Sequence, residues 1–234
     1  MFSFFLKKDK IYLDCFTNEP DLATLFPFRL ASEKLPGWFK HLPNGMEFHG
    51  PVRGTMKTCP GVSDLFRSGF IIVNWLDVYI DVSNNKIDWM PKPRAESHNS
   101  GQWDGHKTSF LKDFYHLKLV SPWKMREKTG IKWLFTNPFW YDDTFKPLVV
   151  NGMVEYKYQH TTSVNMLVPK NMFPKNITIP AGKELAHVIP LSDKEIVLKT
   201  HVVTDNEMKK LDPLTFAFQG NYFKRKKILK DLGR

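Results

Sequence analysis

The stretch Phe70-Ile71-Ile72-Val73-Asn74-Trp75-Leu76-Asp77-Val78-Tyr79-Ile80-Asp81-Val82 carries the strongest β-strand signal of the chain. In its second half, apolar side chains alternate with polar or aromatic ones, as they do in a strand that buries one face. The turn-forming residues 83–86 follow, and then the short apolar segment 87–89. This order predicts a β-hairpin.

Strand signals also recur on both sides of this stretch. They are found at 10–16, 114–120 and 131–136, and then about every ten residues at 148–150, 153–158, 163–168, 183–189 and 195–203. Residues 114–136 read as a second hairpin. The spacing is typical of sandwiches and barrels and not of alternating βαβ units. We therefore predict a mostly-β single domain, a β-barrel or a double-sheet sandwich, with short peripheral helices.

Four segments show helix signals. Residues 32–43 place apolar side chains at helical spacing between prolines, and residues 62–69 predict a helix capped by Ser63 or a neighbour and ended by Gly69. Thr204 and Glu207 fit a capping box for a helix at 205–211. Residues 221–232 predict a terminal helix. The predicted division is a β-rich domain, 1–204, and a basic C-terminal helical appendage, 205–234.

Composition narrows the class of protein. Of 234 residues, 42% are hydrophobic and 14% are aromatic, which is enough for a packed core and excludes a disordered chain. Two cysteines, Cys15 and Cys59, are too few for a disulfide framework or a zinc finger. The first residues do not have the order of a signal peptide, and the chain has no apolar run of membrane-spanning length. We expect a soluble cytoplasmic protein without a membrane partner.

The positive charge is concentrated at the C-terminus. Residues 209–234 hold eight basic residues against two acidic ones, +6 of the net +10. Within this tail, the predicted helix carries Lys224, Arg225, Lys226, Lys227 and Lys230. Clustered basic residues bind nucleic acid by neutralising phosphates. The alternative is a solvated helix face or a contact with an acidic protein partner.

The ten residues 97–106 hold the highest density of side chains that could bind a ligand or take part in catalysis. Asp104 and His106 are two positions apart, so on an extended segment both would point the same way and could hold one ion. His98, or a distant His160, His187 or His201, would complete a set of two histidines and a carboxylate for non-haem iron or another divalent metal. The alternative is a polar loop whose side chains are solvated.

Other binding candidates stand beside this loop. Gln102 and Trp103 lie within it, and Trp103 is the tryptophan least typical of a core. Cys59 precedes a predicted helix, whose N-terminus lowers a thiol pKa, but small buried cysteines are commoner than catalytic ones. Trp123 belongs to a series of tryptophans that would either stack on a planar or sugar ligand or fill the core.

Several phrases, taken in order, resemble an uncharacterised domain family of tailed-phage and bacterial proteins. They are Leu35-Pro36-x-Trp38-Phe39, Lys57-x-Cys59-Pro60, Ser97-His98-x-x-x-Gln102, Pro122-Trp123 before Gly130, Gly152-Met153-Val154-Glu155, and Ile179-Pro180-Ala181-Gly182-x-x-Leu185-Ala186-His187-Val188-Ile189-Pro190. The resemblance covers about residues 30–195. It implies a phage or bacterial origin and brings no known activity.

Residues 150–189 are also similar to the end of the trimeric dUTPase and dCTP deaminase β-barrels. In that family an aspartate follows a Gly-Val-Ile-like strand, whereas Glu155 stands at the aligned position here. The serine-rich phosphate-binding motif of the family is missing from this sequence. The resemblance therefore implies a barrel or β-clip architecture and does not imply nucleotide hydrolysis.

Two functions fit these observations. The first is a phage-type, non-catalytic binding or assembly protein that acts through protein–protein or carbohydrate contacts, in the host cytoplasm or in the virion, with a protein partner or by self-association. It follows from the resemblance and from the lack of a P-loop, a Rossmann glycine pattern or a nucleophile elbow. The alternative is a metal-dependent, oxygenase-like β-barrel enzyme of the non-haem iron type that uses His98, Asp104 and His106.

Overall fold

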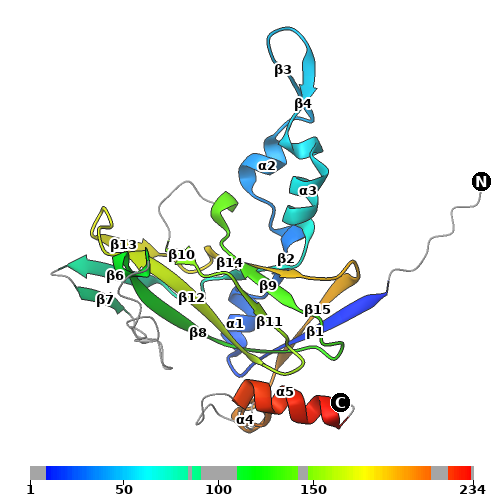
Figure 1. Cartoon of the computed structure of the whole chain (residues 1–234), viewed down its shortest axis with the longest axis vertical. Coiled ribbons are helices and arrows are strands. Elements are labelled where there is room, and N and C mark those ends of the chain that lie inside the picture. The colour runs from blue at the N-terminus through cyan, green and yellow to red at the C-terminus, as the bar shows by residue number, and fades with distance from the viewer. Residues whose placement is uncertain (1–8, 84–85, 91–109, 142–146, 212–220, 233–234) are drawn as a thin grey trace, which may run out of the picture.

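Two five-stranded sheets share one hydrophobic core (Figure 1). The computed structural model describes residues 9–83, 86–90, 110–141, 147–211 and 221–232. The strand order of the first sheet is β10 (Leu148–Val149), β12 (Thr161–Pro169), β8 (Phe114–Arg126), β1 (Lys10–Thr17), β15 (Glu195–Val202). The order of the second is β11 (Gly152–Val154), β9 (Trp133–Thr136), β14 (Glu184–Pro190), β5 (Phe70–Val73), β2 (Arg29–Leu30).

The remaining strands form two smaller sheets. One has the order β13 (Asn176–Ile179), β6 (Val78–Ser83), β7 (Lys86–Met90), and the other is the hairpin β3 (Gly45–Glu47) and β4 (Val52–Gly54). Among the described strands, β1 and β15 run parallel and the other pairs are antiparallel. The predicted mostly-β fold is confirmed, and the arrangement is that of a sandwich. The described strands do not close into a barrel.

The stretch 70–82 forms two strands that belong to different sheets. All four residues of β5 are buried, whereas β6 alternates between buried and more exposed positions. Asn74 lies at the break, where its side-chain amide donates to the carbonyl oxygen of Ile179 at 2.8 Å. Its backbone N–H donates to Lys183 at 2.7 Å. The predicted hairpin between β6 and β7 is confirmed, with Ser83 opposite Lys86.

The second predicted hairpin is wrong. β8 runs through Pro122 without interruption and pairs with β1 and β12, while β9 pairs with β11 and β14. A bulge makes room for the proline: Lys124 lies opposite Thr161 but Val120 lies opposite Ser163. Three residues of β8 therefore face one residue of β12, and a bulge is one of the places where a strand tolerates proline.

The helices are short and lie outside the sheets. They are α1 (Pro20–Leu25), η1 (Ala31–Glu33), α2 (Gly37–His41), η2 (Met56–Thr58), α3 (Pro60–Arg67), η4 (Phe110–Asp113), η5 (Phe139–Tyr141), α4 (Asp205–Leu211) and α5 (Asn221–Asp231). The capping box is confirmed, because Thr204 and Glu207 exchange hydrogen bonds between side chains and backbone. Helix α3 begins earlier than predicted, since Pro60 suits a first helical turn and Ser63 lies inside the helix.

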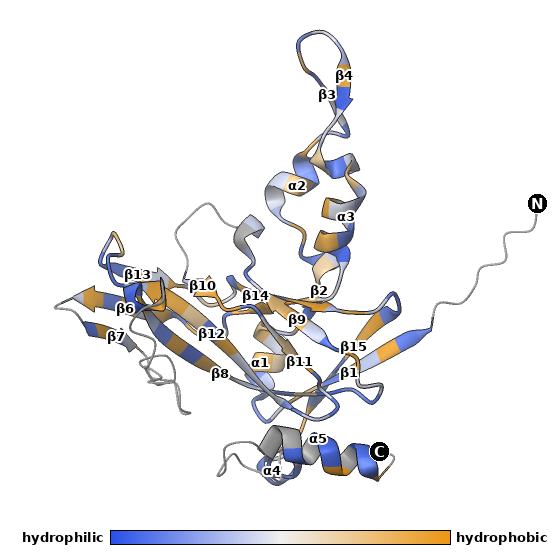
Figure 2. Ribbon diagram, in the orientation of Figure 1, coloured by the Kyte–Doolittle hydropathy of each residue, from blue (hydrophilic) through white to orange (hydrophobic). Residues whose placement is uncertain are grey.

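Aromatic rings form a continuous path through the core. Centroid distances are 5.0 Å from Trp123 to Phe28, 5.5 Å from Phe28 to Phe70, 5.6 Å from Phe70 to Trp133 and 5.7 Å from Trp133 to Tyr156. Figure 2 shows hydrophobic and hydrophilic positions alternating along β8. The burial of its residues alternates as well, and Leu117, Leu119, Trp123 and Met125 belong to this core. Large aromatics thus connect strands of both sheets.

Candidate functional site

An arm stands out from the sheets (Figure 1). It comprises residues 37–67, which form α2, the β3–β4 hairpin, η2 and α3. The two helices lie nearest the sheets, and the hairpin forms the far end. The arm is our candidate site because its base is firmly packed and its far end exposes apolar side chains, as described below.

A cluster of aromatic rings fixes the base of the arm. Phe39 of α2 and Phe66 of α3 are buried, with ring centroids 4.8 Å apart in an edge-to-face arrangement. Trp140 of η5 lies 5.9 Å from Phe66 and accepts a hydrogen bond of 2.7 Å at its carbonyl from the indole of Trp38. The cluster connects three segments of the chain, and such ring pairs each add about 0.5–1.5 kcal/mol beyond their buried area.

Hydrogen bonds around Thr55 brace the stem of the hairpin. The hydroxyl of Thr55 donates to the carbonyl of Pro43 at 2.6 Å, and its backbone N–H donates to Asn44 at 3.0 Å. The ammonium group of Lys57 donates to the carbonyl of Lys40 at 3.0 Å. These bonds tie the hairpin to α2, so the direction of the arm is set by both strands.

The turn of the hairpin uses the geometry of a tight two-residue loop. His49 and Gly50 have φ values of 50° and 106°, and positive φ at both central positions is the requirement of a type I′ turn. The backbone N–H of Phe48 donates to the carbonyl of Pro51 at 3.1 Å. Because Pro51 has no backbone N–H to donate, this is the hydrogen bond that joins Phe48 and Pro51 across the turn.

The end of the hairpin carries apolar side chains that the described chain leaves uncovered. The exposed fractions are 43% for Met46, 47% for Phe48 and 70% for Val52. Met46 is paired with Arg53 and Glu47 with Val52, so Met46, Phe48 and Arg53 share one face of the ribbon and Val52 lies on the other. We call Met46, Phe48, Val52 and Arg53 the arm tip.

The sequence did not lead us to the arm tip. Residues 44–57 show neither a long strand pattern nor a cluster of titratable side chains. One signal was present: apolar Met46 and Phe48 are followed by His49, Gly50 and Pro51, a turn sequence that closes a short ribbon. That signal predicts a hairpin but cannot show that the hairpin stands clear of the sheets.

The candidates predicted from the sequence lie in three different places. His98, Gln102, Trp103, Asp104 and His106 fall outside the described residues. Cys59 is exposed in the arm, between η2 and α3. Trp123 is buried in the core against Phe28. The structure therefore does not bring Cys59 and Trp123 together.

The more distant histidines each have another partner. His187 hydrogen-bonds to the carbonyl of Ser68 at 2.7 Å, and burial lowers its pKa. His160 hydrogen-bonds to the carbonyl of Leu211, at the end of α4. Within the described residues there is no group of three or more histidine, cysteine or acidic side chains suited to a metal ion. The metal site around 97–106 stays a prediction.

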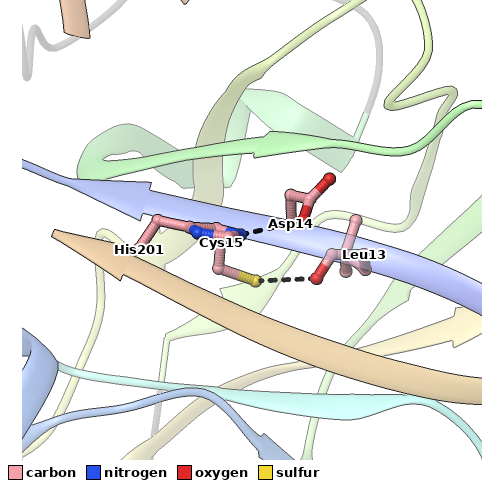
Figure 3. A network of polar contacts seen from close by, with 4 residues as sticks. All are labelled: Leu13, Asp14, Cys15 and His201. Atoms are coloured by element: carbon pink, nitrogen blue, oxygen red, sulfur yellow. Dashed lines mark hydrogen bonds and ion pairs between the residues drawn. The ribbon is translucent and has the colours of Figure 1, made fainter. Parts of the chain in front are cut away.

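His201 and Asp14 form the clearest polar pair on the sheet surface (Figure 3). They come from the parallel neighbours β15 and β1, and 2.8 Å separates the imidazole Nε2 from the carboxylate. The imidazole stacks on Phe16 with ring centroids 4.8 Å apart. In Figure 3 the side chain of Cys15 is turned away from Asp14. Its Sγ lies 3.7 Å from the carbonyl oxygen of Leu13. One imidazole and one carboxylate thus join the two strands.

One lysine of the basic helix α5 contacts the body of the protein. The ammonium group of Lys226 forms an ion pair with the largely buried carboxylate of Glu155, and it lies 5.7 Å from the ring centroid of Tyr158. The side chain of Arg225 is outside the described part of the chain. Other basic side chains of this helix face solvent: Lys224, Lys227 and Lys230. The predicted contact with nucleic acid rests on these.

We expect Lys226→Met to lower the free energy of unfolding by about 2 kcal/mol, because it leaves the Glu155 carboxylate buried without its counter-ion. The measurement is urea denaturation of the wild type, of Lys226→Met, of Glu155→Gln and of the double variant. The double variant should be more stable than Lys226→Met alone, since a neutral amide tolerates burial better than an unpaired charge. Strictly additive losses would show that the two groups do not interact.

Two further observations complete the description. Within the described ranges, the helices are too short or too polar to cross a bilayer. Comparisons with protein-family models, with curated proteins and with solved structures give no match to this chain. The role of the protein must therefore follow from its own geometry.

Proposed function

We propose that this chain is a phage-type, non-catalytic assembly protein that binds another protein chain through the arm tip, in the host cytoplasm or in the virion. The observation that supports this most is the position of Met46, Phe48 and Val52, which are exposed at the end of a projecting hairpin. Apolar side chains that stay exposed at the end of a protruding element are typical of a protein contact.

The backbone of the hairpin supports the same function. Each strand has three residues, and a two-stranded ribbon alone is marginally stable in water. Its outer edges offer backbone N–H and C=O groups to a strand of another protein, the mode of recognition known as β-strand addition. Met46 and Phe48 would then supply apolar contacts to the partner, while Arg53 on the same face would favour a partner with an acidic side chain.

The test compares two substitutions of exposed aromatic residues. Phe48→Asp should weaken binding to the partner at least about tenfold, because it places a charge in the apolar contact. Tyr79→Asp is the control, since Tyr79 is 42% exposed on β6, away from the arm. Both variants should unfold within about 0.5 kcal/mol of the wild type, as exposed positions usually do.

The readout is the native complex. Sedimentation of the purified chain shows whether a second copy of the chain is bound. To find a different partner, the chain is expressed together with the proteins encoded next to it, and the complexes or particles that form are purified. In either case Phe48→Asp should remove the chain from the complex and Tyr79→Asp should not. A wild-type chain that is monomeric and absent from every complex and particle would overturn the proposal.

A further inference from the structure

Helix α5 lies at the opposite end of the molecule from the arm (Figure 1). It contacts the body of the protein at the loop between β11 and β12, where Lys226 pairs with Glu155. The same loop lies against the end of β8, because the backbone N–H of Met125 donates to the carbonyl of His160 at 2.8 Å. The fold thus brings together three segments that are far apart in the sequence: 124–130, 155–161 and 221–232.

These three segments are strongly basic. They hold nine basic residues against three acidic ones, +6 of the net charge of +10. The basic residues are Lys124, Arg126, Lys128, Lys157, Lys224, Arg225, Lys226, Lys227 and Lys230. Four of the nine belong to the body of the protein, so the positive charge at this end of the molecule extends beyond the C-terminal helix.

The acidic residues of the three segments leave most of this charge uncompensated at the surface. The carboxylate of Glu127 is buried and accepts hydrogen bonds from the backbone of the turn that follows it. The carboxylate of Glu155 is largely buried against Lys226, so only Asp231 of the three is exposed. In the described part of the chain, five of the lysines form no ion pair: Lys128, Lys157, Lys224, Lys227 and Lys230. We call these five lysines the basic surface.

The contact between α5 and the body brings like charges together. The ammonium groups of Lys157 and Lys226 are each 5.7 Å from the ring centroid of Tyr158. Glu155 compensates the charge of Lys226, but it leaves the charge of Lys157 beside a helix that carries further lysines. Like charges held this close repel each other and raise the free energy of the folded chain. A bound anion with many charges would remove this repulsion.

We propose that the basic surface binds duplex DNA through its phosphate groups, without reading the bases. A lysine ammonium group is a point charge and binds phosphate without the fixed geometry that arginine imposes. A duplex offers one phosphate charge per about 1.7 Å of its axis, and each lysine that binds there releases counter-ions. Proteins that hold single strands add exposed aromatic rings on which bases stack, whereas Tyr156 and Tyr158 in these segments are buried.

An acidic protein is the competing partner. Ile228 and Leu232 of α5 are 58% and 63% exposed and would give such a protein apolar contacts. Duplex DNA is favoured because the lysines at 224, 227 and 230 recur at every third position, which keeps them on one side of the helix. Ile228 and Leu232 lie about a third of a turn away around the helix axis, outside this row of charges.

Fluorescence anisotropy on the full chain tests the proposal. The probes are labelled duplexes of about 20 base pairs in two unrelated sequences, a single strand of the same length and a polyglutamate peptide of similar charge. The two duplexes should bind equally well and more tightly than the single strand or the peptide. The logarithm of the binding constant should fall with the logarithm of the salt concentration with a slope of about −4.5, since each lysine contributes about −0.9.

The variants separate the body from the helix. Lys128→Gln combined with Lys157→Gln should reduce the size of the slope by about 2, and Lys128→Gln alone by about 1. Glutamine at all three helix positions, 224, 227 and 230, should reduce it by about 3. The matched control is Lys170→Gln combined with Lys175→Gln, two exposed lysines at the other end of β12, which should change neither slope nor affinity. Ile228→Ser combined with Leu232→Ser should also leave duplex binding unchanged.

Several results would overturn the proposal. If glutamine at 128 and 157 has no effect, the helix acts alone, and if the control pair has as large an effect, only the total charge of the chain matters. Tighter binding of polyglutamate would identify an acidic protein as the partner, and tighter binding of the single strand would exclude the preference for a duplex. The absence of duplex binding at about 50 mM salt would also contradict it. Phe48→Asp should bind DNA as the wild type does, so this test and that of the arm tip succeed or fail separately.

Discussion

Replacement of Gly69 by alanine is expected to lower the free energy of unfolding by about 4 kcal/mol or more, which is an exceptional value for one methyl group. Gly69 has a φ of +74°, and a Cβ atom there would lie 1.9 Å from the backbone carbonyl oxygen of Val188. For a residue with a Cβ atom, the left-handed backbone conformation is itself unfavourable in free energy. The larger cost is steric, because the atom in the way belongs to the backbone of the central strand β14.

The position of Gly69 explains why the clash cannot relax locally. Gly69 follows the end of α3, and its carbonyl accepts the backbone N–H of Ala31 at 3.0 Å. One residue earlier, the carbonyl of Ser68 accepts from His187 of β14. To make room for a methyl group, either β14 must move within its sheet or the end of the arm must leave it. Both movements break hydrogen bonds that join the arm to the sheets.

Two other glycines provide the comparison. Gly61 lies in α3, and a methyl group added there would have no atom within 4 Å, so Gly61→Ala should stabilise the protein by about 0.5–1 kcal/mol. Gly50 has a φ of +106° in open space, so Gly50→Ala carries the conformational cost of about 1–2 kcal/mol without a clash. Denaturation midpoints are expected to fall in the order Gly61→Ala, Gly50→Ala, Gly69→Ala. Equal midpoints for the last two would show that the contact with Val188 is not tight.

The features that were predicted correctly from the sequence depend on neighbours along the chain. The capping box needs Thr204 and Glu207 three positions apart, and the helix end at Gly69 needs a residue that accepts positive φ. The β6–β7 hairpin needs a turn between two apolar segments. Each of these signals is complete within a few residues, so no knowledge of the tertiary structure is required.

The features that were missed depend on distant partners. β1 pairs in parallel with β15, with Lys10 beside Glu195, and no local pattern could select that partner. The course of β8 through Pro122 depends on a bulge opposite Thr162, and that bulge is a property of two strands. At the candidate site, Met46 and Phe48 are important only because the hairpin has no neighbour in the described structure.

Phe66→Ala is the second change with a large expected effect, a loss of about 3–5 kcal/mol from the stability of the arm. Phe66 is 1% exposed and is in contact with the rings of Phe39, Trp38, Trp140 and Tyr141. Its removal leaves a cavity where rings from α2, α3 and η5 meet. Most core truncations destabilise a whole domain, but this one lies in a cluster separate from the main core.

The loss should therefore be local before it is global. Hydrogen exchange should accelerate at residues 37–67 in Phe66→Ala, while amides of β8 and β12 keep their protection. Phe66→Leu is the matched variant, since it keeps most of the apolar volume and should preserve slow exchange in the arm. Uniform acceleration in all strands would show that the arm and the sheets unfold as one unit.

The same variant separates two ways in which the arm could act. Phe66 is buried, so it cannot touch a partner at the arm tip. If binding needs the hairpin held in one direction, Phe66→Ala should weaken the complex although Met46, Phe48 and Val52 are unchanged, because the partner must then order the arm at its own cost. Phe66→Leu should restore binding. If Phe66→Ala loosens the arm without weakening the complex, the aromatic base would serve stability alone, and the apolar tip would bind as a flexible segment.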